Sequence, residues 1–94
     1  MGVEHATAYR GVRQRVTELI APLGDVRDRP CPATPAWSVH DVLAHMVGVC
    51  DDVAAGRLDG ITTDAWTDAQ VQPRRDRATR MLLAEWEQIG RAHV

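Results

Sequence analysis

The stretch Trp37-Ser38-Val39-His40-Asp41-Val42-Leu43-Ala44-His45-Met46 decides how this chain folds. Ser38 stands where a helix N-cap belongs, and Asp41 places an acidic side chain at the third helical position, where the helix dipole favours negative charge. We therefore predict a helix that begins after Ser38 and ends near Gly56 or Arg57. Its apolar face is expected to consist of Val39, Leu43, Met46, Cys50, Val53 and Ala54.

Further helices are predicted on both sides of this one. Residues 4–20 place apolar side chains at three- and four-residue steps and should stop before Pro22. Residues 62–71 begin with capping residues and should contain a short helix, and residues 78–88 should form another. No strand pattern is present, so the fold class is all-α. We expect the first two helices to pack together through Tyr9, Val12, Val16 and Leu19 against Leu43, Met46, Cys50 and Val53.

Composition excludes several classes of function. The chain has 94 residues, enough for one domain, with 45% hydrophobic residues and a formal net charge of -2. This profile gives no reason to expect nucleic acid or an anionic membrane as a partner. No apolar run is long enough to cross a membrane and no secretion signal is present, which predicts a cytoplasmic protein. The two cysteines, Cys31 and Cys50, are then expected to be reduced.

His45 is the residue most suited to chemistry. At about 100° per residue it lies at the flank of the apolar stripe and points toward a seam between helices. An imidazole there can bind a metal or can simply be hydrogen-bonded to a neighbour. Asp41 and Asp52, one turn before and two turns after, could orient the ring or could be solvated. His40 is expected at the surface, as are Arg74, Arg75, Arg77 and Arg80.

Residues 31–48, CPATPAWSVHDVLAHMVG, resemble the signature of the maleylpyruvate isomerase N-terminal family. That signature is a proline-rich loop followed by Trp-Ser/Thr-Val-x-Asp-Val-x-x-His-Leu-x-Gly. Residues 63–71 and 83–86 are similar to the third-helix region of the same family. The family is mycothiol-dependent and belongs to the DinB-like group of helical proteins. The resemblance therefore implies an up-and-down four-helix bundle.

The resemblance also implies a divalent metal, usually zinc. In the family a histidine of the second helix binds the metal with two His or Glu ligands, one turn apart on the last helix. His45 matches the first ligand, and the other two have no counterpart, which implies a bundle truncated before its last helix. The metal would favour the thiolate of mycothiol, which adds to a cis double bond of a small electrophilic substrate, allows rotation and leaves again. Thiol transfer to another electrophile would use the same site.

The last six residues are expected to lie outside the natural domain. Residues 89–94 can be encoded by ATCGGAAGAGCACACGTC, a string found in a common sequencing-library adapter. The alternative is a natural helix end with Gly90 as its cap. The expected domain is therefore residues 1–88.

Two hypotheses of function follow. The first is a mycothiol-dependent, metal-binding enzyme with His45 as a ligand. The alternative is a non-catalytic helical module that binds a partner, in which His45 is structural.

Overall fold

Four α-helices make up the chain over residues 2–92, which the computed structural model describes, with side chains placed for residues 10–91. The helices are α1 (Gly2–Ile20), α2 (Val39–Ala55), α3 (Asp64–Val71) and α4 (Thr79–Ala92), with 3-10 turns η1 (Ala21–Leu23) and η2 (Gln72–Arg74). Within these residues no β-strand forms, and an isolated bridge joins Pro30 to Ser38. The all-helical class is confirmed. None of the helices described is long and apolar enough to span a membrane.

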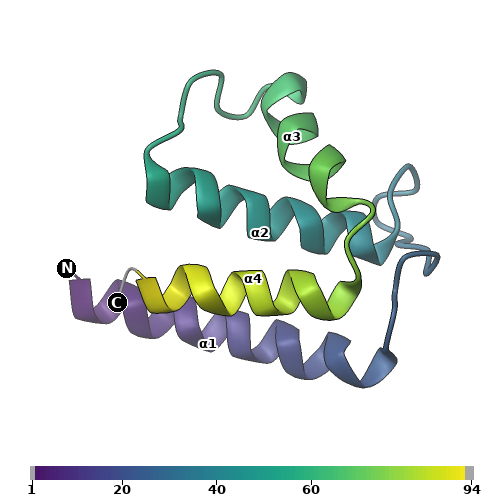
Figure 1. Ribbon diagram of the computed structural model, residues 1–94, viewed down its shortest axis with the longest axis horizontal. Helices are drawn as coiled ribbons and strands as arrows, with labels where there is room; N and C mark the ends of the chain where they lie inside the picture. The colour runs from purple at the N-terminus through teal and green to yellow at the C-terminus, as the bar shows by residue number, and fades with distance from the viewer. Residues whose placement is uncertain (1, 93–94) are drawn as a thin grey trace.

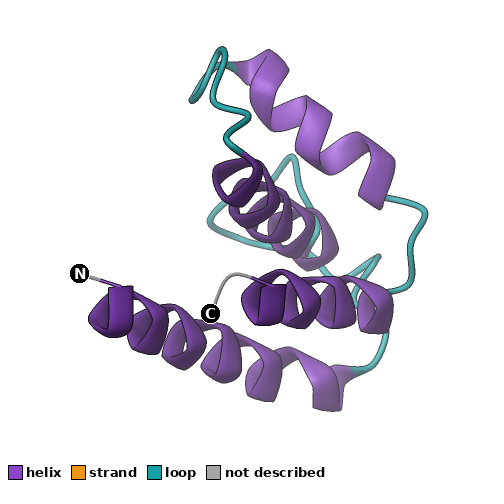
Figure 2. Ribbon diagram, turned by 60° about the vertical axis from the view of Figure 1, so that its left-hand side comes forward, coloured by secondary structure: helices purple, strands orange, loops and turns teal. Residues whose placement is uncertain are grey.

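The three long helices lie side by side and α3 crosses α2 (Figures 1 and 2). Helix α4 lies between α1 and α2, so the predicted packing of the first helix on the second is wrong. Leu82 and Trp86 of α4 fill the core with Leu43, Ala44 and Val47 of α2, and Val16 and Ile20 of α1 pack against this cluster. Val12 and Leu19 are instead 49% and 72% exposed. The side chain of Tyr9 lies outside the described residues.

The start of α2 is fixed by the predicted cap. Ser38 Oγ accepts the Asp41 amide at 3.2 Å, and Asp41 Oδ2 accepts the Ser38 amide at 3.3 Å, which completes a capping box. The helix ends at Gly56, whose φ of 77° is left-handed, as expected. Its buried residues are His40, Leu43, Ala44, Val47 and Gly48, so the face turned to the core is rotated from the predicted one and Val53 is exposed.

His40 is buried, which corrects the expectation that it lies at the surface. Its Nδ1 is 3.0 Å from Thr79 Oγ1, and its Nε2 is 3.2 Å from the carbonyl oxygen of Arg74. Thr79 Oγ1 also accepts the Val26 amide at 3.1 Å and donates to Asp25 at 3.2 Å. The Arg27 amide, followed by the Thr79 hydroxyl, lowers the pKa of Asp25. The start of α4 and the loop before α2 thus cover the first turn of α2, and each ring nitrogen of His40 has a polar neighbour within hydrogen-bond distance.

Helix α3 reaches α2 at Gly48. Thr63 caps α3 by accepting the Trp66 amide at 3.2 Å, as its sequence predicts. A Cβ at Gly48 would overlap Gln70 Cβ and come within 2.8 Å of Gln70 Cγ and 3.1 Å of Arg74 Nη1. The absence of a side chain therefore lets the two helices approach this closely.

Arg74 is 7% exposed, so the expectation of a solvated side chain is wrong for this residue. Its Nη2 lies 2.7 Å from Glu85 Oε2 and 3.4 Å from Asp51 Oδ2, and its Nη1 donates to the Gln70 carbonyl at 2.9 Å. A buried guanidinium needs such partners. Arg75, Arg77 and Arg80 are exposed, as expected.

Replacing Gly48 by alanine should lower the free energy of unfolding by about 1–3 kcal/mol, because the new methyl group meets the Gln70 side chain. Gly11→Ala is the matched control. Gly11 also lies inside a helix, but its nearest neighbour is the Arg15 guanidinium at 3.8 Å, so alanine should raise stability by about 0.5–1 kcal/mol. Urea unfolding measures both. A stabilising effect of Gly48→Ala would contradict the close approach of α2 and α3.

Thr79→Val should lower stability by about 1–3 kcal/mol, since it leaves the buried Val26 amide without its acceptor. Thr17→Val supplies the comparison, because Thr17 Oγ1 is buried with no hydrogen-bond partner among the described residues. Its loss should change stability by less than about 0.5 kcal/mol or increase it. Thermal unfolding of the two variants measures both effects. Equal losses of stability would mean that the Thr79 hydroxyl does not hold the start of α4 to the loop before α2.

Candidate functional site

His45 is half-buried on α2, between α3 and the loop that precedes α2. Its Nδ1 lies 2.8 Å from Oε1 of Gln70 on α3. The ring of Trp37 covers it from the loop, with ring centroids 5.5 Å apart and planes tilted by 49°. The imidazole thus lies at a seam between segments, as its place on the helix predicts, and it is held by contacts from two directions.

Gln70 connects His45 to a series of polar side chains. Its Nε2 donates to Asp52 Oδ2 at 3.0 Å, and Asp52 Oδ1 accepts from Arg57 Nε at 2.9 Å. We call His45, Gln70, Asp52 and Arg57 the polar chain. The Asp52 hydrogen bond is the main cause that raises the pKa of Arg57, with Asp51 adding to it. The cation therefore anchors the outer end of the polar chain.

Sequence reasoning did not single out Gln70, although it is the direct partner of His45. The side chain is only 1% exposed, which is unusual for glutamine. The available signal was its place on α3 one turn after Trp66, which is half-buried. That spacing shows that the two share a helix face, but it does not show which helix they meet.

The two aspartates that could orient His45 have different roles. Asp52 reaches the ring indirectly, through Gln70. Asp41 does not take part, because it caps α2 and its Oδ1 lies 3.3 Å from Arg75 Nε. Only one of the two candidates therefore belongs to the site.

The described residues offer one candidate metal ligand at this site. Nδ1 of His45 is engaged by Gln70, and within the described part of the chain Nε2 has no hydrogen-bond partner, which suits a coordinating nitrogen. His40 is unsuited, because both of its ring nitrogens are paired. Among the side chains of residues 10–91, no three His, Cys, Asp or Glu residues gather where they could hold an ion. The described residues therefore do not complete a metal site.

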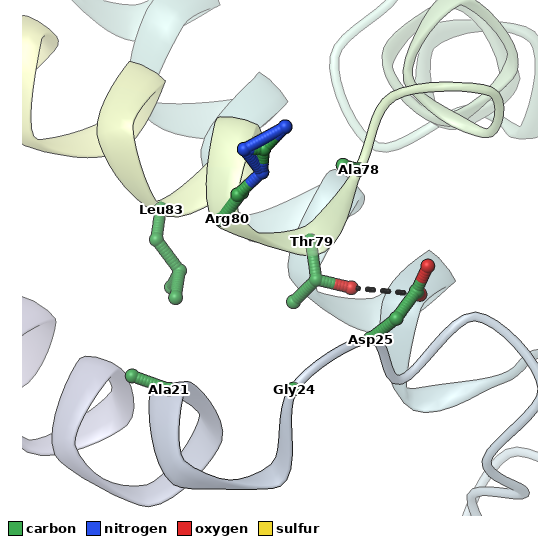
Figure 3. Close-up of a pocket in the computed structure, with 7 residues that line it drawn as sticks. All are labelled: Ala21, Gly24, Asp25, Ala78, Thr79, Arg80 and Leu83. Carbon is green, nitrogen blue, oxygen red and sulfur yellow. Dashed lines mark hydrogen bonds between the residues drawn. The ribbon is translucent and has the colours of Figure 1, made fainter.

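The surface hollows on the described part of the molecule include two that differ in their relation to the polar chain. One, of about 320 Å³, lies between η1 and the start of α4, where Figure 3 shows the hydrogen bond from Thr79 to Asp25. It contains no residue of the polar chain. The other, of about 650 Å³, lies between the end of α2 and α3, and Asp52, Arg57 and Trp66 help to line it. The outer end of the polar chain therefore borders a space open to solvent.

Comparison with known proteins identifies the family. Neither the curated proteins nor the solved structures gave a match. The family model described as mycothiol maleylpyruvate isomerase N-terminal domain matches residues 9–93. The match contains the capped start of α2, His45 and Gln70, and it covers nearly the whole sequence. The chain therefore belongs to the mycothiol maleylpyruvate isomerase N-terminal domain family.

Proposed function

We propose that this chain is part of a mycothiol-dependent enzyme in which His45 binds a divalent metal, with zinc the expected ion. The observation that carries the proposal is the state of the two ring nitrogens. Nδ1 is bonded to the buried amide of Gln70, whereas Nε2 has no partner among the side chains of residues 10–91. Histidines that bind metals commonly donate the other ring N–H to a fixed acceptor, which orients the ring and raises its basicity.

The remaining ligands are proposed to come from residues other than those described. A catalytic zinc typically has three protein ligands and one open position. We expect the two further ligands to be His or Glu side chains one turn apart on another helix of the parent protein. The domain is then residues 1–88, with residues 89–94 derived from an adapter. Helix α4 continues through Ala92, so Gly90 lies inside the helix and does not cap it.

The family supports a reaction between a thiol and a small electrophile. A metal ion at the site would lower the pKa of a bound thiol and so supply a thiolate at neutral pH. The reaction class is thiol addition to a cis double bond, rotation about the resulting single bond and loss of the thiol, or else thiol transfer to another electrophile. The protein's own part is to hold the imidazole fixed through Gln70 and Trp37. We place the protein in the cytoplasm and expect no nucleic-acid partner.

A second candidate is a non-catalytic helical module that binds a protein. It is favoured by the exposure of Val12, Leu19 and Val53, which are large apolar side chains on α1 and α2. In that case the contacts of His45 with Gln70 and Trp37 would serve only the packing of α3. A His or Glu pair at i, i+4 in the parent gene beyond residue 88 favours the enzyme, and its absence favours the module.

Zinc titration at one pH tests the proposed function. The parent protein should bind one ion per site, and His45→Ala should weaken binding by more than about 100-fold, which exceeds the usual loss for removing an outer-shell partner. The 94-residue chain should bind zinc weakly, because the side chains described, those of residues 10–91, offer one candidate ligand at this site.

Cys31→Ser is the control, since it removes a half-buried thiol of the preceding loop and should leave zinc affinity unchanged. Tight stoichiometric binding by the 94-residue chain would show that the ligands are other than those proposed. Unchanged binding in the His45→Ala parent would remove His45 from the site.

A further inference from the structure

We propose that Gln70 is a positioning residue that fixes His45 in the tautomer with the proton on Nδ1 and the lone pair on Nε2. The inference rests on the proposed function only in taking Nε2 as the metal-binding atom. The hydrogen bonds that carry it belong to the described residues and involve no metal.

The direction of the Gln70 amide follows from its partners. A primary amide has a donor end and an acceptor end of nearly the same shape, so its neighbours decide which way it points. The Asp52 carboxylate, when ionised, only accepts hydrogen bonds, so the NH2 group faces Oδ2 at 3.0 Å. The side-chain oxygen of Gln70, Oε1, is then the atom that faces His45. The reverse orientation would set that oxygen against a carboxylate and leave both acceptors unpaired.

The tautomer of His45 follows from the direction of the amide. A carbonyl oxygen accepts and cannot donate, so the short 2.8 Å contact requires a proton on Nδ1. A neutral imidazole carries one N–H, and Nε2 is therefore left with its lone pair. Asp52 lies seven residues after His45 on α2. Its carboxylate thus decides, through the Gln70 amide, which nitrogen of His45 can bind a cation.

The parts of this arrangement are held in place from outside. Arg57 donates to the other oxygen of Asp52 at 2.9 Å, which limits rotation of the carboxylate. Gly48 allows α3 to lie close enough to α2 for the Gln70 side chain to pass between the helices. Gln70 itself is buried, so water does not offer its amide an alternative set of partners.

Proton–nitrogen correlation spectra of the 94-residue chain at about pH 9, where an ordinary histidine is neutral, test the inference. These spectra distinguish the protonated ring nitrogen from the bare one. The wild-type protein should show His45 with the proton on Nδ1. Gln70→Met, which keeps the length of the side chain but removes the amide, should shift the signal to a mixture of tautomers. If Gln70 served only to pack α3 on α2, the Gln70→Met variant would leave the tautomer signal of His45 unchanged.

Asp52→Asn provides a second variant that keeps the side-chain shape. The new amide can donate to Gln70, so the Gln70 amide is free to turn over and the tautomer should again become mixed. Asp68→Asn makes the same change of charge at an exposed position of α3 and should leave the His45 signal unchanged. Backbone amide shifts of α2 and α3 show that each variant is folded. A wild-type proton on Nε2, or an unmixed Nδ1–H signal in folded Gln70→Met, would overturn the inference.

Zinc affinity of the parent protein separates this inference from the proposed function. Gln70→Met should weaken zinc binding by about 10–100-fold, less than His45→Ala. A wild-type Nδ1–H tautomer in a parent that binds no zinc would sink the proposed function and leave the role of Gln70 standing. If the parent binds zinc through His45 but the metal-free protein carries the His45 proton on Nε2, the proposed function stands and the role of Gln70 is overturned.

Discussion

The close packing of α3 on α2 at Gly48 is the contact on which the rest of the structure depends. It brings two polar residues of one α3–η2 face, Gln70 and Arg74, into the interior, where each must find partners. Gln70 finds His45 and Asp52 on α2, and Arg74 finds Glu85 on α4. The Arg74 carbonyl oxygen also lies 3.2 Å from Nε2 of the buried His40. One helix crossing therefore positions the candidate site and ties it to the core helices.

The sequence predicts the features that neighbouring residues determine. The cap at Ser38, the end of α2 near Gly56 and the start of α3 on a capping residue depend on side chains within a few positions, and all three are confirmed. The place of His45 at a seam follows from helical periodicity alone. The burial of His40 and Arg74 could not be predicted in this way, because their partners Thr79 and Glu85 lie far along the chain. An isolated sequence marks such residues as polar and so suggests a solvated position.

Periodicity also shows which residues share a face but does not show which helix covers that face. The apolar positions of α1 predict an amphipathic helix correctly, yet its partner is α4 and not α2. Leu82 and Trp86 give α4 a bulky apolar face, and this face already occupies the middle of the core against Leu43 and Val47. Val16 and Ile20 of α1 pack against that cluster, while Leu19 remains exposed. The error therefore came from the choice of partner and not from the helix itself.

Stability alone does not account for the polar chain. Replacing a buried polar network by apolar side chains of similar volume is often neutral or stabilising. In this network Gly48 admits α3, and the buried amide of Gln70 meets His45. What they provide is a fixed direction for one imidazole and a defined proton on it. A packing contact between α2 and α3 would need neither, whereas a metal ligand gains from both, because a nitrogen that is already oriented and unprotonated loses little freedom on binding. The fixed direction of the His45 imidazole is therefore the feature that the proposed metal site would use.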